Sequence, residues 1–143
     1  MAEIVFTSDE IGYINIFEGV TGVRVMDCII KSEDDLIIFI IDGPAIKAIG
    51  KDGSKIRLLR EYINYDIKIV SYNPDPAIFI RNIFAPYKPK KVEIIEEEGR
   101  KKAYVYVDAA IKPKAIGKSG KNVRLAKEIV KRHFEDIDTV LVV

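Results

Sequence analysis

Two seven-residue segments, 67 positions apart, are nearly identical, and this repeat limits the available folds more than any other feature of the chain. Residues 47–53 run Lys-Ala-Ile-Gly-Lys-Asp-Gly, and residues 114–120 differ from them only where serine replaces aspartate. A recurrence at one register indicates a duplicated structural unit. We therefore expect the 143 residues to form two similar units, residues 1–72 and 73–143.

The secondary-structure signals come in the same order in both halves. Apolar residues at helical spacing predict the helices, and β-branched runs predict the strands. In the first half the expected ranges are 9–18 (helix, with Ser8 as its N-cap), 23–30 and 36–41 (strands), 44–49 and 54–63 (helices) and 67–70 (strand). In the second half they are 74–84, 91–96, 103–108, 111–116, 121–133 and 137–142. Each unit is thus predicted to be α-β-β-α-α-β, so the chain belongs to the α+β class.

A short segment from Ser71 to Pro76 joins the two units, and its two prolines stiffen the backbone. A unit of about 70 residues buries only about 60% of the surface that its unfolded chain exposes, whereas a single body twice that long buries about 70%. We therefore expect the two units to pack together as one rigid body.

Charge is distributed unequally between the two units. The whole chain has a formal net charge of +1, which favours no class of partner. Residues 1–71 carry 8 basic and 12 acidic side chains, a net charge of −4, and residues 72–143 carry 15 and 10, a net charge of +5. The second unit therefore has the charge balance of a protein that binds a polyanion.

In each unit the repeated segment places a glycine-rich loop between two predicted helices. Gly50 and Gly53, like Gly117 and Gly120, permit backbone conformations that are closed to other residues and let a ligand backbone approach closely. The helix that follows offers unpaired N–H groups and the positive end of its dipole. Basic residues outnumber acidic ones five to one around the first loop and eight to one around the second. A phosphodiester backbone is the ligand that matches these features together.

Apolar residues flank both loops and would form the floor of a groove for bases. They are Ile49 and Ile56 in the first unit and Ile116 and Val123 in the second. Neither half supplies an aromatic stacking platform near its loop, which favours a narrow aliphatic groove over a surface of stacked rings. Tyr62, Tyr65, Tyr104 and Tyr106 are interpreted as residues of the core or the sheet face rather than as base stackers.

The segments Ile49–Gly53 and Ile116–Gly120 resemble the Ile-Gly-x-x-Gly signature of KH domains of the type II topology. Two such units with a short linker resemble the archaeal NusA-like transcription factors over nearly the whole chain. The resemblance implies that each unit binds about four nucleotides of single-stranded RNA, with the loop clamping the sugar-phosphate backbone. It also implies a role in transcription elongation, termination or antitermination. Bacterial relatives carry a polymerase-binding region and an OB-fold module for which this chain has no room, so RNA polymerase is a candidate partner only.

We assign RNA-contacting roles to both loops. Lys118 and Ser119 would contact phosphate, with further lysines and an arginine supplying the positive field. The predicted RNA-binding residues are Lys114, Ile116, Gly117, Lys118, Ser119, Gly120, Lys121, Val123 and Arg124 in the second unit, and Ile49, Gly50, Lys51, Gly53, Lys55 and Arg57 in the first. Asp52 would face a phosphate, and like charges at about 4 Å repel by roughly 1 kcal/mol in water. We therefore expect a degenerate first loop and a stronger RNA site in the second unit.

Two other functions are compatible with these features. A ribosome-associated or rRNA-processing factor would use the same fold for RNA. In a protein-interaction module, one or both grooves would not bind RNA, and the acidic first unit would dock a basic partner.

Catalysis is not expected. No nucleophile and base, and no pair of carboxylates, cluster near the loops. A P-loop would need a glycine where the chain has Lys112. Cys28, interpreted as buried, and His133, interpreted as packing or capping at a helix end, are the only residues of their types, so neither a zinc site nor another cofactor is expected. The lack of a signal peptide or a long apolar run predicts a cytoplasmic protein without membrane contact. We also expect a monomer.

Overall fold

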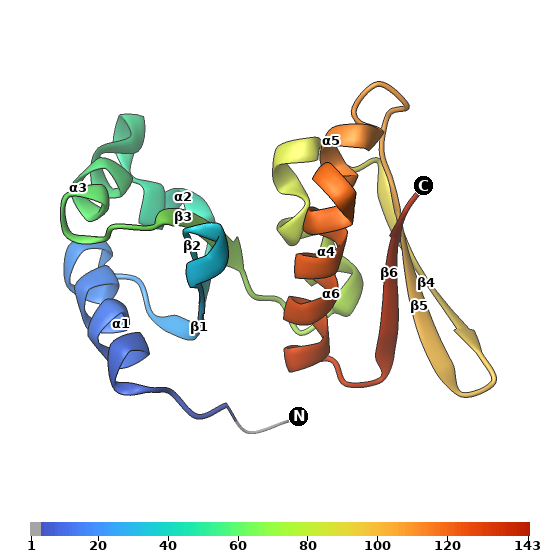
Figure 1. Cartoon of the computed structure of the whole chain (residues 1–143), viewed down its shortest axis with the longest axis horizontal. Coiled ribbons are helices and arrows are strands. Elements are labelled where there is room, and N and C mark those ends of the chain that lie inside the picture. Colours follow the sequence, from blue (N-terminus) through green and yellow to red (C-terminus); the bar gives the residue numbers. More distant parts are fainter. Residues whose placement is uncertain (1–3) are drawn as a thin grey trace. The chain divides into compact units, whose positions relative to one another are not determined.

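The computed structural model describes residues 4–143, which divide into two compact units, Ile4–Tyr72 and Asn73–Val143 (Figure 1). Each unit has the element order α-β-β-α-α-β, with one-turn 3-10 helices between some of the elements. The predicted order of elements and the predicted α+β class are therefore confirmed. The expectation that the two units pack as one rigid body stays a prediction.

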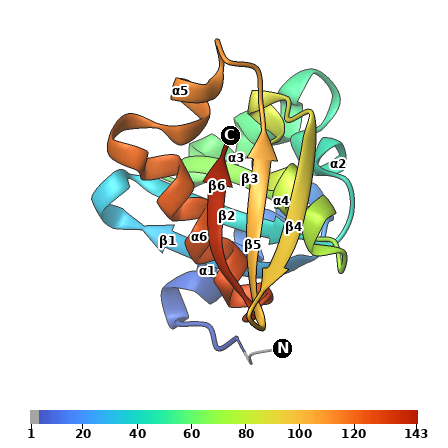
Figure 2. The same cartoon turned by 90° about the vertical axis from the view of Figure 1, so that its right-hand side faces the viewer.

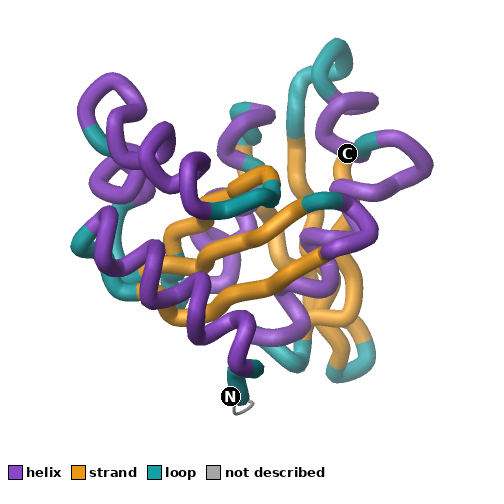
Figure 3. The backbone as a smooth tube through the Cα atoms, turned by 60° about the vertical axis from the view of Figure 1, so that its left-hand side comes forward, coloured by secondary structure: helices purple, strands orange, loops and turns teal. Residues whose placement is uncertain are grey.

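The first unit contains a three-stranded sheet and three α-helices. Their bounds are α1 Ser8–Thr21, β1 Val25–Lys31, β2 Leu36–Ile41, α2 Ala45–Ile49, α3 Ser54–Tyr62 and β3 Asp66–Ser71. The strand order is β1-β2-β3, with β1 antiparallel and β3 parallel to the central strand. Figure 3 shows the helix that follows the N-terminus running across the strands of this sheet. Since parallel neighbours need a crossover connection, α2 and α3 together link β2 to β3.

The second unit repeats this arrangement. Its elements are α4 Pro76–Ile83, β4 Lys91–Glu97, β5 Arg100–Tyr106, α5 Lys112–Ile116, α6 Lys121–His133 and β6 Ile137–Val142. The strand order is β4-β5-β6, again with one antiparallel and one parallel pair (Figure 2). Here the crossover from β5 to β6 consists of α5, the glycine loop and α6, so the loop lies between two helices in both units.

The first helix begins at Ser8, the residue predicted to be its cap, so both the helix and its cap start one residue earlier than expected. Thr7, not Ser8, is the N-cap: its hydroxyl accepts the Glu10 N–H at 3.2 Å, and the Glu10 carboxylate accepts the Thr7 N–H at 2.7 Å. This reciprocal pair is a capping box, which needs Glu three residues after the cap and so selects Thr7.

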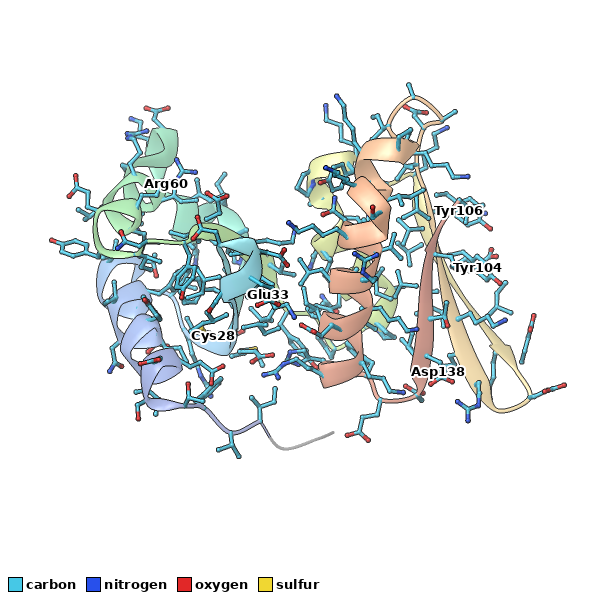
Figure 4. The ribbon with its side chains drawn as sticks, in the orientation of Figure 1. Cys28, Glu33, Arg60, Tyr104, Tyr106 and Asp138 are labelled. Atoms are coloured by element: carbon cyan, nitrogen blue, oxygen red, sulfur yellow. The ribbon has the colours of Figure 1, made fainter. Side chains whose placement is uncertain are left out.

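Aromatic residues anchor both cores. Phe17 of α1 and Phe39 of β2 stack with centroids 4.3 Å apart in the first unit, beside buried Leu59. Cys28 is a buried free thiol in this core, as its apolar surroundings predicted (Figure 4). In the second unit, the buried His133 ring meets Phe79 edge-on at 5.4 Å. The packing role predicted for His133 is therefore confirmed.

The central strands of the two sheets differ in their pattern of burial. In β5, Ala103 and Val105 are buried, and the half-buried Tyr104 and Tyr106 project from the other side of the sheet, away from the helices (Figure 4). These two tyrosines are thus sheet-face residues, as predicted, and Tyr65 packs against the core of the first unit. Tyr62, at the end of α3, is 61% exposed, so its assignment to the core or a sheet face was wrong. In β2 every residue from Ile37 to Ile41 is buried, so both faces of this strand are covered.

Among the described residues, no helix is long and apolar enough to cross a bilayer.

Candidate nucleic-acid interface

The two glycine loops have the same backbone conformation. Each begins at the end of a five-residue helix, α2 or α5, and leads into α3 or α6. The φ angles at equivalent positions of the two loops differ by at most one degree. They are 80° at Gly50 and at Gly117, 54° at Asp52 against 55° at Ser119, and 74° at Gly53 against 75° at Gly120. The repeat in sequence is therefore a repeat in backbone geometry, which includes a left-handed residue that is not glycine.

The first glycine of each loop has no room for a side chain. A Cβ atom on Gly117 would lie 2.9 Å from the backbone nitrogen of Asn122, and one on Gly50 would lie 3.0 Å from that of Lys55. Positive φ angles add a conformational penalty for any other residue. These glycines let the start of the next helix pack directly against the loop.

The apex of the loop exposes backbone donors. The Gly120 N–H donates to the Gly117 carbonyl at 3.1 Å and closes the turn, as Gly53 does to Gly50 in the first unit. Within the described residues, the N–H groups of Lys118 and Ser119 have no protein acceptor. Successive N–H groups in a tight turn of this kind form a concave anion-binding site. The geometry therefore suits a phosphate oxygen.

Arginine supports the loop in both units. The Nη1 atom of Arg57 donates to the Asp52 carbonyl, and that of Arg124 donates to the Ser119 carbonyl. Each arginine thus bonds the third residue of its own loop, which is the left-handed residue that is not glycine. The sequence predicted only that these guanidinium groups add to the positive field.

The second residue of the following helix ties each loop to the rest of its unit. Asn122 donates to the Lys114 carbonyl at 3.0 Å, and Lys55 donates to the equivalent Lys47 carbonyl at 3.2 Å. Lys55 also donates to the Thr21 carbonyl at the end of α1, at 3.1 Å. Its ammonium group therefore bonds two protein carbonyls. Asn122 is missing from the predicted list because an uncharged amide carries no local signal for RNA.

The structure places one aromatic side chain, Tyr87, next to the residue that anchors the second loop. Its hydroxyl accepts a hydrogen bond from the Asn122 amide at 2.9 Å, although the two residues are 35 positions apart. Tyr87 is half-buried in the one-turn helix that follows α4. The expectation that no aromatic stacking platform lies near a loop stays a prediction, and Tyr87 could not be placed there from the sequence because it lies far from the loop along the chain.

The predicted site residues fall into two groups by exposure. The apolar and glycine positions and Lys55 are half-buried, and the other cations and Ser119 are exposed. The half-buried residues are Ile49, Gly50, Gly53, Lys55, Ile116, Gly117, Gly120 and Val123, and the exposed ones are Lys51, Arg57, Lys114, Lys118, Ser119, Lys121 and Arg124. Ile46, 74% exposed and one helical turn before Ile49, is an apolar neighbour that the sequence list lacks. The RNA-binding roles of the listed residues stay predictions.

The lysines at the loops differ electrostatically from those at the far end of α6. Within the described residues, Lys51, Lys114 and Lys118 form no ion pair. Lys131 instead lies 2.9 Å from the Asp138 carboxylate, whose pKa is held below its usual value by Lys131 and then by Arg100. These three lysines therefore place positive charge at the loops that no described carboxylate neutralises. No group of three or more described His, Cys, Asp or Glu side chains is placed to hold a metal ion.

Comparison with known proteins supports the domain assignment. A family model described as the NusA-like second KH domain matches residues 76–139. The crystal structure of APE1850 is similar, with a TM-score of 0.78 and 34% sequence identity, covering 96% of this chain and all of that one. Together with the observed topology, these matches confirm two tandem KH units of type II.

Curated relatives are found among archaea. The probable transcription termination protein NusA of Methanocaldococcus jannaschii is 32% identical over 134 residues, which cover 93% of this chain and 72% of that protein. The protein of the same name from Thermoplasma acidophilum is 31% identical over 135 residues, 94% of this chain and 92% of that protein. The similarity therefore extends across both units.

Proposed function

The chain belongs to the family of archaeal NusA transcription termination proteins, and we propose that it serves this role by clamping single-stranded RNA in its two glycine loops, chiefly the second. It would bind the transcript without catalysing a reaction on it. RNA polymerase would be its protein partner, and the bound transcript would link the chain to the polymerase.

The observation that carries the proposal is the pair of unused N–H groups at the apex of the second loop. These donors belong to Lys118 and Ser119. The side chain of Lys118 is exposed and forms no ion pair among the described residues. A backbone phosphate accepts hydrogen bonds and carries the opposite charge, so it satisfies both features at once. Bases next to that phosphate would lie over the half-buried Ile116 and Val123.

The first loop offers the same donors with a carboxylate beside them. Asp52 is exposed at the position that Ser119 occupies in the second loop. A phosphate about 4 Å from this carboxylate would be repelled by roughly 1 kcal/mol in water, which corresponds to about fivefold in affinity. We therefore rank the first loop as the weaker RNA site.

A matched pair of variants tests the proposal. The change Lys118→Asp with Ser119→Asp, and the single change Lys51→Asp, each give a loop with the sequence Gly-Asp-Asp-Gly. Affinity for short single-stranded RNA is measured by fluorescence anisotropy over a salt series, where each phosphate contact contributes about 0.7 to the log–log slope. We expect more than tenfold weaker binding for the second-loop variant and a smaller loss for the first. Unchanged affinity in the second-loop variant would refute this site, and a larger loss in the first would reverse the ranking.

The partner is tested separately. The chain is used to capture RNA polymerase or ribosomal subunits from an archaeal extract, with and without nuclease. Capture of polymerase supports a role at the transcribing complex, and capture of ribosomal subunits supports the ribosome-associated alternative. RNA binding that is absent at every salt concentration would favour the protein-interaction alternative.

A further inference from the structure

We propose that Arg57 and Arg124 are positioning residues that hold their loops in the phosphate-binding conformation and do not themselves contact phosphate. The inference rests on the proposed function of the loops in RNA binding. It assigns these two arginines a different role from the lysines around them.

The contact is the same in both units. Each guanidinium donates through Nη1 to the carbonyl of the third loop residue, Asp52 or Ser119. The same Nη1 lies beside the last glycine of the loop, where an added Cβ would come within 3.3 Å of it in either unit. Each arginine therefore contacts the second half of its loop, at the left-handed residue that is not glycine and at the glycine after it.

That residue needs support because the left-handed conformation is unfavourable for side chains with a Cβ atom. The φ and ψ angles are 54° and 28° at Asp52, and 55° and 29° at Ser119. Aspartate tolerates this region better than most residues, and serine lacks that preference. An arginine bonded to the carbonyl of the strained residue stabilises this conformation over the extended one. Arg124 therefore has more to stabilise than Arg57.

The same carbonyl controls the donors that face the ligand. The Ser119 carbonyl lies in the same peptide plane as the Gly120 N–H, which closes the turn on the Gly117 carbonyl at 3.1 Å. A change in the backbone angles of Ser119 would break this closure and reorient the peptide that carries the Ser119 N–H, so the concave pair formed with the Lys118 N–H would be lost. Loss of the arginine bond should therefore weaken phosphate binding without removing a phosphate contact. A lysine that touched phosphate would behave differently, because its removal would also lower the salt dependence.

The experiment combines Arg124→Gln with Ser119→Gly in a double-mutant cycle on the full chain. Glycine is at ease in the left-handed region, so it should make the arginine unnecessary. We expect Arg124→Gln alone to weaken RNA binding by about fivefold, with an unchanged salt slope. In the Ser119→Gly background the same change should cost less than about twofold. Lys127→Gln, an equal loss of charge at an exposed position of the same helix, gives the purely electrostatic effect.

A loss that persists in the Ser119→Gly background, together with a salt slope lower by about 0.7, would show that Arg124 contacts phosphate and would overturn the inference. NMR of the RNA-free chain gives a second readout: the chemical shifts and HN–Hα coupling of Ser119 should change in Arg124→Gln and not in Lys127→Gln. If the unaltered chain fails to bind RNA, the proposed function fails, and this NMR comparison still decides whether the arginine positions the loop.

Discussion

The first and second loops share their backbone angles to within two degrees, their paired glycines and their arginine-to-carbonyl bond, and they differ in the residue at the apex, Asp52 or Ser119. The shared parts determine where donors point. The differing residue determines how much negative charge stands beside them. In this molecule, therefore, the shape of the site and its affinity for an anion are set by different residues, and one can change without the other.

The second residue of the helix after each loop also combines a shared structural role with a different side chain. Lys55 and Asn122 bond equivalent carbonyls eight positions before them, yet one is a cation and the other an amide. Lys55 reaches a second carbonyl on α1, whereas Asn122 reaches a tyrosine hydroxyl. Two chemically different side chains thus make the same hydrogen bond that anchors the loop, and each makes a second hydrogen bond to a different residue.

The strongest test of the shared geometry is the first glycine of each loop. Gly50→Ala and Gly117→Ala should each lower the free energy of unfolding by about 3 kcal/mol, because the backbone region is essentially restricted to glycine and the new Cβ meets a backbone nitrogen. Urea denaturation measures the effect. Gly12→Ala, in α1 with no atom within 4 Å, is the control and should stabilise the chain by about 1 kcal/mol. Clearly unequal costs at Gly50 and Gly117 would break the equivalence of the two loops.

The next largest effect concerns the residues that anchor the loops. Lys55→Ala should cost about 2 kcal/mol of stability, because a charged donor to two carbonyls is lost. Asn122→Ala should cost about 1 kcal/mol, since its donor is neutral. Lys51→Ala, at an exposed loop position, should change stability by no more than about 0.5 kcal/mol. Equal effects at Lys51 and Lys55 in thermal or urea unfolding would contradict the anchoring role.

Exchanging the apex residues sharpens the difference in charge. Asp52→Ser should strengthen RNA binding by the first loop about fivefold, and Ser119→Asp should weaken the second by a similar factor, through about 1 kcal/mol of repulsion. Each is measured with the other loop disabled by the Gly-Asp-Asp-Gly change. Affinities that do not move in opposite directions would mean that the apex charge does not distinguish the units.

The smallest expected effect is a pH dependence of the second unit that arises from its ion-paired carboxyl groups. Hydrogen bonds from Lys101 to Asp136, and from Lys131 and Arg100 to Asp138, lower the pKa of both carboxyl groups below 3.8. Their stabilising contribution is complete above that value and is lost as the pH falls through the lower pKa of the folded state. Both groups are exposed, so the loss is modest.

Amide exchange resolved by unit, between pH 5 and pH 3, measures this loss. Asp138→Asn should reduce the pH dependence of the second unit, whereas Asp42→Asn in the first should leave it unchanged. An acid sensitivity of the second unit that is unchanged in Asp138→Asn would contradict the assignment to this ion pair.

Sequence patterns by themselves determined the duplication, the order of elements and the position of the loops. Helix α6 and strand β6 occupy the predicted residues, 121–133 and 137–142, and the glycine loops interrupt the helices where expected. These features are local: helical periodicity, β-branched runs and paired glycines act on the backbone within a few residues.

The tertiary structure alone decided which side chains support each loop. The contacts of Asn122 with Tyr87 and of Lys55 with Thr21 join residues 35 and 34 positions apart. The direction of Arg57 and Arg124, toward a carbonyl, also depends on how the loop folds back on its helix. A residue's type shows that it can donate a hydrogen bond, but only the folded chain brings it to its acceptor.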